Sequence, residues 1–222
     1  MLKFIFVTDF IVISGDYEKE GQALGEYHLL RSDANQIIYQ QSTTEQPAAT
    51  ELKFIYFIED SGWWVGEKVG NVDGWFFNPS LGKTLPLSGW KYKDGFKYQA
   101  DNSIQIKEGR LTPSCTEITI SLAGAVLQRQ RPVAGVYKLQ HGRMFNGRNI
   151  FKDDNDRLLY IANDGAWMIG PKLFWYNLRS KSGANIPLSS DEWLYWDGIE
   201  RKVKDTDEVT VSCKPFNPDE GN

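Results

Sequence analysis

The chain repeats one stretch of sequence at a fixed distance. Tyr56–Lys68 aligns without a gap with Tyr160–Lys172, which lies 104 positions further on. A second block, Trp90–Gly95, aligns with Trp193–Gly198 at an offset of 103. Because a repeat of this size sets the number of structural units, the chain is expected to contain two copies of one module.

Two modules in 222 residues have about 100 residues each, a common domain size that allows each a core of its own. We place module one at residues 1–109 and module two at residues 116–222, joined by a short linker at residues 110–115. Tryptophan is frequent, with 8 residues, and aromatic side chains make up 14% of the chain. The sequence is therefore a tryptophan-rich tandem repeat.

Short runs of Ile, Val, Tyr, Phe and Trp alternate with Gly, Asn, Asp and Pro in both modules. Breaks about every 8–12 residues are typical of the strands and turns of all-β proteins. No window has a sustained apolar period of 3.6 residues, so no long helix is expected. We predict an all-β fold of two tandem antiparallel β-sandwich or small β-barrel modules related by internal duplication.

Local signals refine this prediction. A short aromatic strand is expected at Trp75–Phe77, with its counterpart at Phe174–Tyr176. Asp94-Gly95 and Asp197-Gly198 fit two-residue hairpin turns.

The two copies differ most in their loops. Module one carries a polar insertion at Gln40–Thr50, and module two carries the segment Ala123–Pro132 between its first expected strand and Gly135. Loops usually carry function on a β scaffold. The copies are therefore expected to bind differently.

The apolar residues 2–14 are expected to form one or two buried strands. A secretory signal peptide is the alternative, although Asp9 interrupts the run and no clear cleavage site follows. No stretch of 18 apolar residues exists, so we expect a soluble protein without a membrane span. The net charge of −4 argues against nucleic acid as a partner, because binding to a phosphate backbone requires a basic face.

Module two contains an ordered series of single residues: Gly135, Tyr137, Asn146-Gly147-Arg148, Tyr160, Trp167, Ile169-Gly170, Pro187 and Trp193. This order resembles a Trp-rich β repeat of long multi-repeat proteins from protists and marine invertebrates, and the resemblance covers nearly the whole chain. Module one departs from it, with Asn35-Gln36 in place of Asn-Gly-Arg. The resemblance implies a repeat architecture and no particular chemistry, since that family has no settled activity.

Residues with catalytic or metal-binding chemistry are scarce. The two histidines, His28 and His141, do not align between the copies, and with two cysteines they cannot complete a zinc site without carboxylates. No Gly-rich phosphate loop, nucleophile elbow or dinucleotide fingerprint is present. We predict no catalytic residue, no metal and no cofactor.

Two acidic features need an interpretation. Lys152–Asp156 has oxygen ligands suited to Ca²⁺, but the glycine and the distal glutamate of a calcium loop are missing, which favours a polar turn. Asp60 and Asp164 occupy matching positions in the two copies. A matched acid can be catalytic, but a duplicated turn former is the favoured interpretation.

The tryptophans form two groups. Those that recur in both copies at fixed register are expected to lie in the two cores: Trp63, Trp90, Trp167 and Trp193. The others are less well matched: Trp64, Trp75, Trp175 and Trp196.

Trp196 stands where module one has Lys93. A position that accepts lysine tolerates solvent, so Trp196 is expected to be exposed unless something covers it, with Trp175 and Tyr176 beside it. Tryptophan and tyrosine are common interface anchors. We therefore predict that Trp175, Tyr176 and Trp196 form a partner- or ligand-binding surface.

Cys115 and Cys213 flank the first and last expected strands of module two. If those strands are antiparallel neighbours, the Cα atoms fall within the range of about 4.4–6.8 Å that a disulfide requires. Module one has no cysteine at either place, so the fold does not depend on a bridge. That favours two free thiols, as in a reducing compartment, whereas a bridge would indicate an oxidising, extracellular setting.

Taken together, these features favour a non-enzymatic binding or structural module that contacts a protein partner or a larger assembly through loops and surface aromatics. The first alternative is a carbohydrate-binding module in which aromatic rings stack on sugars. The second is a carboxylate-dependent hydrolase, which needs two carboxylates facing one cleft.

Overall fold

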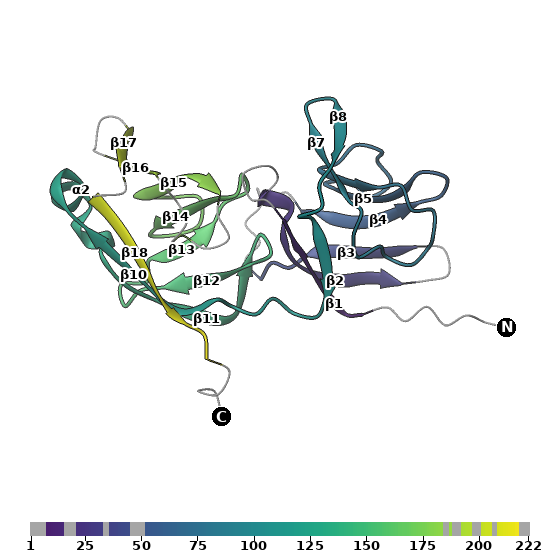
Figure 1. Ribbon diagram of the computed structural model, residues 1–222. Coiled ribbons are helices and arrows are strands. Elements are labelled where there is room, and N and C mark those ends of the chain that lie inside the picture. Colours follow the sequence, from purple (N-terminus) through teal and green to yellow (C-terminus); the bar gives the residue numbers. More distant parts are fainter. Residues whose placement is uncertain are drawn as a thin grey trace. The chain divides into compact units, whose positions relative to one another are not determined.

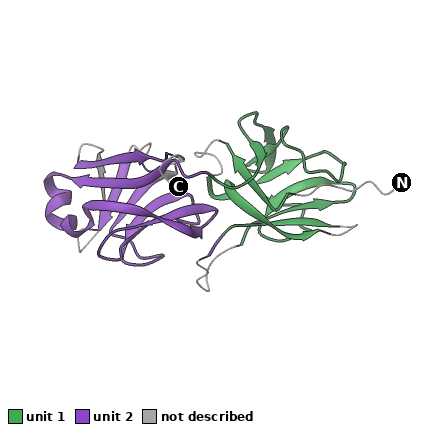
Figure 2. Ribbon diagram, turned by 90° about the horizontal axis from the view of Figure 1, so that it is seen from below, with its two compact units in different colours: residues 1–42, 49–111 green, residues 43–48, 112–222 purple. Residues whose placement is uncertain are grey.

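The computed structural model describes residues 8–15, 21–32, 36–44, 52–183, 187, 192–196, 201–205 and 208–217. The chain divides into two compact units (Figure 2). Residues 1–42 and 49–111 form the first, and residues 43–48 and 112–222 form the second. They are called module one and module two below.

Module one is a single antiparallel sheet. Its elements within the described residues are β1 (Phe10–Ser14), η1 (Gly21–Ala23), β2 (Gly25–Ser32), β3 (Ile37–Gln41), β4 (Phe54–Ile58), β5 (Gly62–Gly66), β6 (Phe76–Asn78), β7 (Lys91–Asp94), β8 (Lys97–Ala100) and β9 (Gln105–Glu108). The strands follow the order β8-β7-β6-β5-β4-β3-β2-β1-β9 (Figure 1). The sheet curls, and the N–H of Ile106 in β9 donates to the Leu87 carbonyl, beyond β6, at 2.9 Å.

Module two has the same topology. Its elements within the described residues are β10 (Cys115–Leu122), α2 (Gly124–Gln130), η2 (Arg131–Val133), β11 (Gly135–Phe145), β12 (Arg148–Lys152), β13 (Leu158–Ile161), β14 (Ala166–Gly170), β15 (Leu178–Gly183), β16 (Glu192–Trp196), β17 (Arg201–Asp205) and β18 (Val209–Pro215). The order is β17-β16-β15-β14-β13-β12-β11-β10-β18. The chain is therefore all-β, with two similar curled sheets, and β5 and β14 hold the same place in them.

Alternation along the strands explains where the cores lie. In β1 the buried residues are Ile11 and Ile13, and in β10 they include Ile118 and Ile120, so every second side chain points inward.

The repeated tryptophans lie in the two cores, as predicted. Trp63 is 0% exposed and packs with Trp90 in module one, whereas Trp167 is 2% exposed and packs with Trp193 in module two. Each core surrounds its own tryptophan pair with aliphatic side chains. The cores are therefore separate and equivalent.

Each sheet also carries an apolar cluster on its outer face. Trp64 lies opposite Tyr56 in the strand pairing of module one, and Met168 lies opposite Tyr160 in module two. All four side chains are buried in clusters separate from the cores. Trp64 is thus an outer-face residue with Met168 as its equivalent.

The Gly-x-Tyr pattern marks a repeated start of the second strand. Tyr27 donates its hydroxyl to the Ala23 carbonyl at 2.7 Å, and Tyr137 donates to the Val133 carbonyl at 2.9 Å. In both modules the acceptor lies four residues upstream, at the end of a short 3-10 helix. The phenol therefore fixes the same corner twice.

Two turn predictions have different outcomes. Gly95, with φ of 59°, opens the turn between β7 and β8, as expected for Asp94-Gly95. Asp197-Gly198 lies outside the described residues.

The loop expected at Ala123–Pro132 instead contains α2 and η2. Only Val126 and Gln130 of α2 are buried, and seven residues are too short for an apolar period to show. Of the insertion expected in module one, Gln40 and Gln41 belong to β3, and residues 45–50 lie outside the described part.

The strands expected within residues 2–14 can be compared with the structure only from residue 8 onward. Phe10–Ser14 forms β1, and residues 1–7 lie outside the described range. Among the described residues no helix is long and apolar enough to cross a membrane.

The connection between the modules is tied to β2 of module one. Glu26, which is buried, accepts hydrogen bonds from the Ser42 hydroxyl at 3.1 Å and from the Leu111 N–H at 2.8 Å. Arg110 lies 3.7 Å from the same carboxylate and stacks on Phe10. Residues 110–111, predicted as linker, are thus bonded to module one.

Cys115 and Cys213 form a disulfide, so the favoured expectation of free thiols is wrong. Strands β10 and β18 pair antiparallel, which brings the two Cα atoms to 5.6 Å. The bridge spans a sequence separation of 98 and links the first strand of module two to its last.

The disulfide should stabilise module two alone. Reduction, or the double substitution Cys115→Ala with Cys213→Ala, is expected to lower the free energy of unfolding of module two by about 2–4 kcal/mol, because the open chain gains conformational entropy. Urea denaturation of the whole chain measures this, with module one as the internal control. Equal loss in both modules, or no loss, would contradict the assignment.

Candidate functional site

A loop crosses the outer face of each sheet after the Trp-x-[Val/Ile]-Gly strand pattern that the two copies share. We call it the cover loop: residues 67–75 in module one and residues 171–177 in module two. Val69 of the first packs on the outer-face cluster of module one, and Leu173 and Tyr176 of the second pack on that of module two.

Gly170 allows the cover loop of module two to pass close to the sheet. A Cβ atom at this position would lie 1.8 Å from the carbonyl oxygen of Trp175, a distance that no side chain can occupy. In module one the backbone is further from the equivalent Gly66, since a Cβ there would lie 2.9 Å from the Tyr56 hydroxyl and 3.2 Å from the Asp73 carbonyl oxygen. The glycine of the repeated pattern is therefore the point at which the backbone of the cover loop passes over the sheet.

A buried tyrosine holds each cover loop. The Tyr160 hydroxyl accepts a hydrogen bond from the Phe174 N–H at 2.6 Å, and the Tyr56 hydroxyl donates to the Asn71 carbonyl at 2.8 Å. Burial raises the pKa of both phenols to about 12. The repeated tyrosine and glycine thus serve one purpose, which is to place this loop.

Backbone hydrogen bonds after the loop establish which positions are equivalent. The N–H of Trp75 donates to the Val65 carbonyl, and the N–H of Asn177 donates to the Ile169 carbonyl, both at 2.8 Å. Trp75 and Asn177 therefore correspond. Counting back two residues pairs Asp73 with Trp175.

The next strand extends the comparison. The Lys93 N–H donates to the Trp75 carbonyl at 2.9 Å, and the Trp196 N–H donates to the Asn177 carbonyl at 3.2 Å. Lys93 and Trp196 therefore correspond, as the sequence alignment proposed.

The two modules carry different chemistry at these matched positions. In module one, Lys93 Nζ and Asp73 Oδ1 form an ion pair at 2.5 Å. In module two, the same two positions are Trp175 and Trp196, which are 63% and 43% exposed. A solvated ion pair in one copy is thus replaced by two exposed indoles in the other.

The exposed indoles border an open pocket of about 520 Å³, which we call the aromatic pocket. Its lining residues are Pro171, Phe174, Trp175, Tyr176, Asn177 and Trp196. The three predicted site residues all line it. Pro171, Phe174 and Asn177 were not predicted, and their place in the cover loop is the signal that identifies them.

The predicted strand at Phe174–Tyr176 is wrong. These residues belong to the cover loop, and β15 begins at Leu178. The cover loop of module two has seven residues, 171–177, against nine, 67–75, in module one, which misaligned the aromatic runs. At Trp75–Phe77, the observed strand β6 begins one residue later, at Phe76.

Local contacts fix the orientation of Trp175. Its backbone N–H donates to the Lys172 carbonyl at 3.2 Å, and Lys172 Nζ lies 4.5 Å from the centroid of its indole ring. Phe174 has a φ of 66°, which is rare for a bulky residue, and packs edge-on against Phe145. Strained backbone of this kind concentrates at functional sites.

Trp196 is held from the other side of the pocket. The side-chain amide of Gln130, at the end of α2, donates to the Trp196 carbonyl. This support comes from the segment between β10 and β11. The sequence singled out that segment but not its contact with Trp196.

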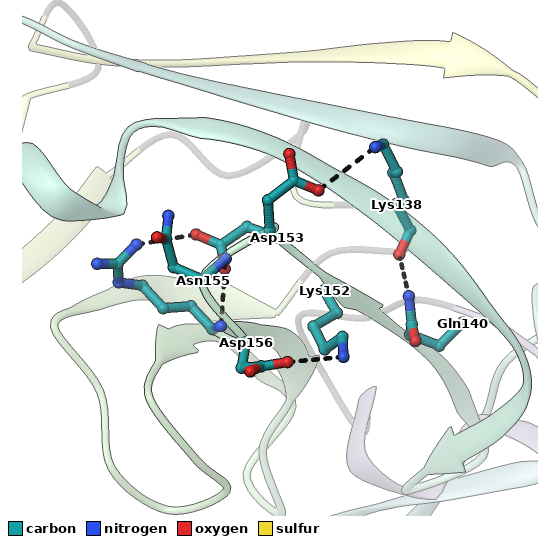
Figure 3. A network of polar contacts seen from close by, with 8 residues as sticks. Lys138, Gln140, Lys152, Asp153, Asn155 and Asp156 are labelled. Carbon is teal, nitrogen blue, oxygen red and sulfur yellow. Dashed lines mark hydrogen bonds and ion pairs between the residues drawn. The ribbon is translucent and has the colours of Figure 1, made fainter.

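The remaining acidic candidates lie in turns. Figure 3 shows the polar network around Lys152–Asp156, where the Asp153 carboxylate accepts bonds from the N–H groups of Asn155 and Arg157 at 3.0 and 2.7 Å. Asp60 and Asp164 lie in the turns after β4 and β13. Turn formation accounts for these residues.

The histidines lie apart from the aromatic pocket lining. His28 is half-buried in β2, where burial lowers its pKa, and His141 is exposed on β11. Within the described part of the chain, no three His, Cys, Asp or Glu residues are grouped closely enough to hold a metal ion.

Comparison with protein-family models, with curated proteins and with solved structures gave no match.

Gly170→Ala should displace the cover loop of module two. Overpacking is expected to cost about 1–3 kcal/mol of unfolding free energy and to change the environment of Trp175. Urea denaturation and the indole N–H resonance of Trp175 in an NMR spectrum provide the two readouts. Gly66→Ala, where the backbone oxygen is further away, is the matched control and should cost less. A wild-type Trp175 resonance in a stable Gly170→Ala protein would rule out the crossing-point interpretation.

Stability should fall at alkaline pH. Burial raises the pKa of Tyr39, Tyr56 and Tyr160 to about 12, above the value of about 10 for an unfolded chain. The neutral phenols therefore stabilise the fold fully below about pH 10, and this contribution is lost as the pH rises towards 12. Denaturation at several pH values, with tyrosinate absorbance, measures it. Tyr56→Phe should flatten the dependence for module one alone. Free ionisation of these phenols near pH 10 in the folded protein would contradict the prediction.

Proposed function

We propose that the protein is a non-enzymatic binding module that contacts a protein partner or a larger assembly through the aromatic pocket of module two. The observation that carries this proposal is the replacement of the Asp73–Lys93 ion pair by Trp175 and Trp196. The fold accepts charged, solvated side chains at these positions. Two exposed tryptophans there are best explained by burial under a partner.

The form of the pocket supports this proposal. Trp and Tyr are the most frequent energetic anchors of protein interfaces, where they bury a large rigid area. Contacts from Gly170, Tyr160 and Gln130 hold the loop and strand that carry the indoles. Preorganised anchors lose less entropy on binding than mobile ones.

Carbohydrate binding is the second candidate, because Asn177 places an amide beside the aromatic rings. Against it, Lys172 lies over the ring of Trp175, where a sugar would stack. A hydrolase has less support still, since no carboxylate is among the described residues that line the aromatic pocket. Glu67 and Asp73 line the equivalent pocket of module one, where Asp73 is paired with Lys93.

The disulfide supports an extracellular or otherwise oxidising setting for this binding function, because disulfides persist mainly in such compartments.

The test replaces the two tryptophans of the aromatic pocket with the residue types that module one has at the matching positions. The double variant Trp175→Asp with Trp196→Lys installs the ion pair of module one and is expected to fold. We expect it to lose at least about 30-fold in affinity for proteins captured by the wild-type chain from its native source, as removal of an anchor tryptophan does. Quantitative mass spectrometry of captured proteins, alongside an array of immobilised glycans, gives the readout.

The control is Asp73→Ala with Lys93→Ala in module one, which should leave capture unchanged. If the pocket variant captures the same proteins as the wild type, the proposal fails. If only glycan binding is lost, the carbohydrate alternative replaces it.

A further inference from the structure

The side chains of Trp175, Trp196 and Lys172 offer hydrogen-bond donors at the aromatic pocket. Neither indole N–H of Trp175 and Trp196 reaches an acceptor within the described residues, whereas the buried Trp63 and Trp90 each donate to a backbone carbonyl at 2.9 Å. Lys172 adds an exposed ammonium group beside Trp175. A ligand that fits this pocket therefore presents acceptors.

A cationic side chain lies beside the pocket within the described residues, although the chain as a whole carries −4. Lys172 lies on the Trp175 side. On the Trp196 side, Gln130 bonds the Trp196 carbonyl, and its sequence neighbours Arg129 and Arg131 are both exposed. A negatively charged ligand is complementary to this surface.

We infer that the aromatic pocket binds an extended, acidic, proline-containing segment of the partner protein. Proline rings pack flat on indole rings, and Pro-rich segments in the polyproline II conformation dock in aromatic-lined grooves. Proline offers a carbonyl acceptor and no N–H donor, which matches a pocket rich in donors. This inference rests on the proposed function of the same pocket and names its ligand class.

Other ligand classes match the pocket less well. A cationic ligand would meet the ammonium of Lys172, which already lies 4.5 Å from the centroid of the Trp175 ring. A neutral sugar needs acceptors as well as donors for its hydroxyl groups, and Asn177 is the one side-chain amide of the lining.

The experiment uses three synthetic peptides of equal length, made of repeated Pro-Pro-Glu, Pro-Pro-Lys and Ala-Ala-Glu triplets. Isothermal titration calorimetry measures their binding to the full chain, and a soluble oligosaccharide is titrated in parallel. We expect saturable binding of the Pro-Pro-Glu peptide at one site, and at least about fivefold weaker binding of both other peptides. Trp175→Asp with Trp196→Lys should abolish the binding.

Charge is tested separately. Lys172→Glu should weaken the Pro-Pro-Glu peptide about fivefold and remove its advantage over the Pro-Pro-Lys peptide. Lys68→Glu, at the matching position of module one, should change neither.

The outcomes separate this inference from the proposed function. If no peptide binds, or the lysine or alanine peptide binds as well as Pro-Pro-Glu, the inference is wrong. If that happens while the double tryptophan variant still loses the natural partner, the proposed function stands without it. If the double variant captures that partner as the wild type does, both are wrong.

Discussion

The close passage of the cover loop over Gly170 is the constraint on which the candidate site depends. The Trp175 carbonyl oxygen lies where any larger residue would place its Cβ. With Tyr160 bonding the Phe174 N–H, this contact determines where the loop crosses the sheet. This crossing places Trp175 at the edge of the aromatic pocket. Trp196 borders the same pocket from β16, which is separated from β14 by β15. Exposure of both indoles follows from backbone placement more than from their own packing.

Comparison of the two copies shows which residues belong to the shared framework and which surface residues differ. The Tyr–Gly crossing, the core tryptophans and the strand order are shared by both modules. The side chains at the matched surface positions differ: Asp73 and Lys93 form an ion pair in one copy, and the other copy has two exposed indoles. The disulfide is a further feature that only module two carries, because both cysteines of the chain lie there. Module one therefore provides a matched control for the exposed tryptophans and the disulfide of module two.

The sequence predicted the parts of the fold that periodicity and repetition encode. An ungapped block across β4–β5 and β13–β14 preserved the inward facing of Trp63 and Trp167, because a slip of one residue would have reversed every side chain. Exposure of Trp196 could be predicted because its counterpart is a lysine.

Other features depend on tertiary contacts that leave no pattern in the sequence. The assignment of Phe174–Tyr176 to a strand failed because the cover loops differ in length, which a gap-free comparison could not register. The helix α2 was too short to show a period. The disulfide was disfavoured by its absence from module one, but only the pairing of β10 with β18 could decide it.

The central claim is that both modules bury equivalent tryptophans and that module two alone displays a further pair. Oxidative footprinting of the folded chain, with mass spectrometry of each tryptophan, tests it without any ligand. Trp175 and Trp196, at 63% and 43% exposure, should be modified rapidly, while Trp63 and Trp167 should react only as their modules unfold. Protection of Trp175 and Trp196 to the level of Trp63, or rapid modification of Trp167, would contradict the account.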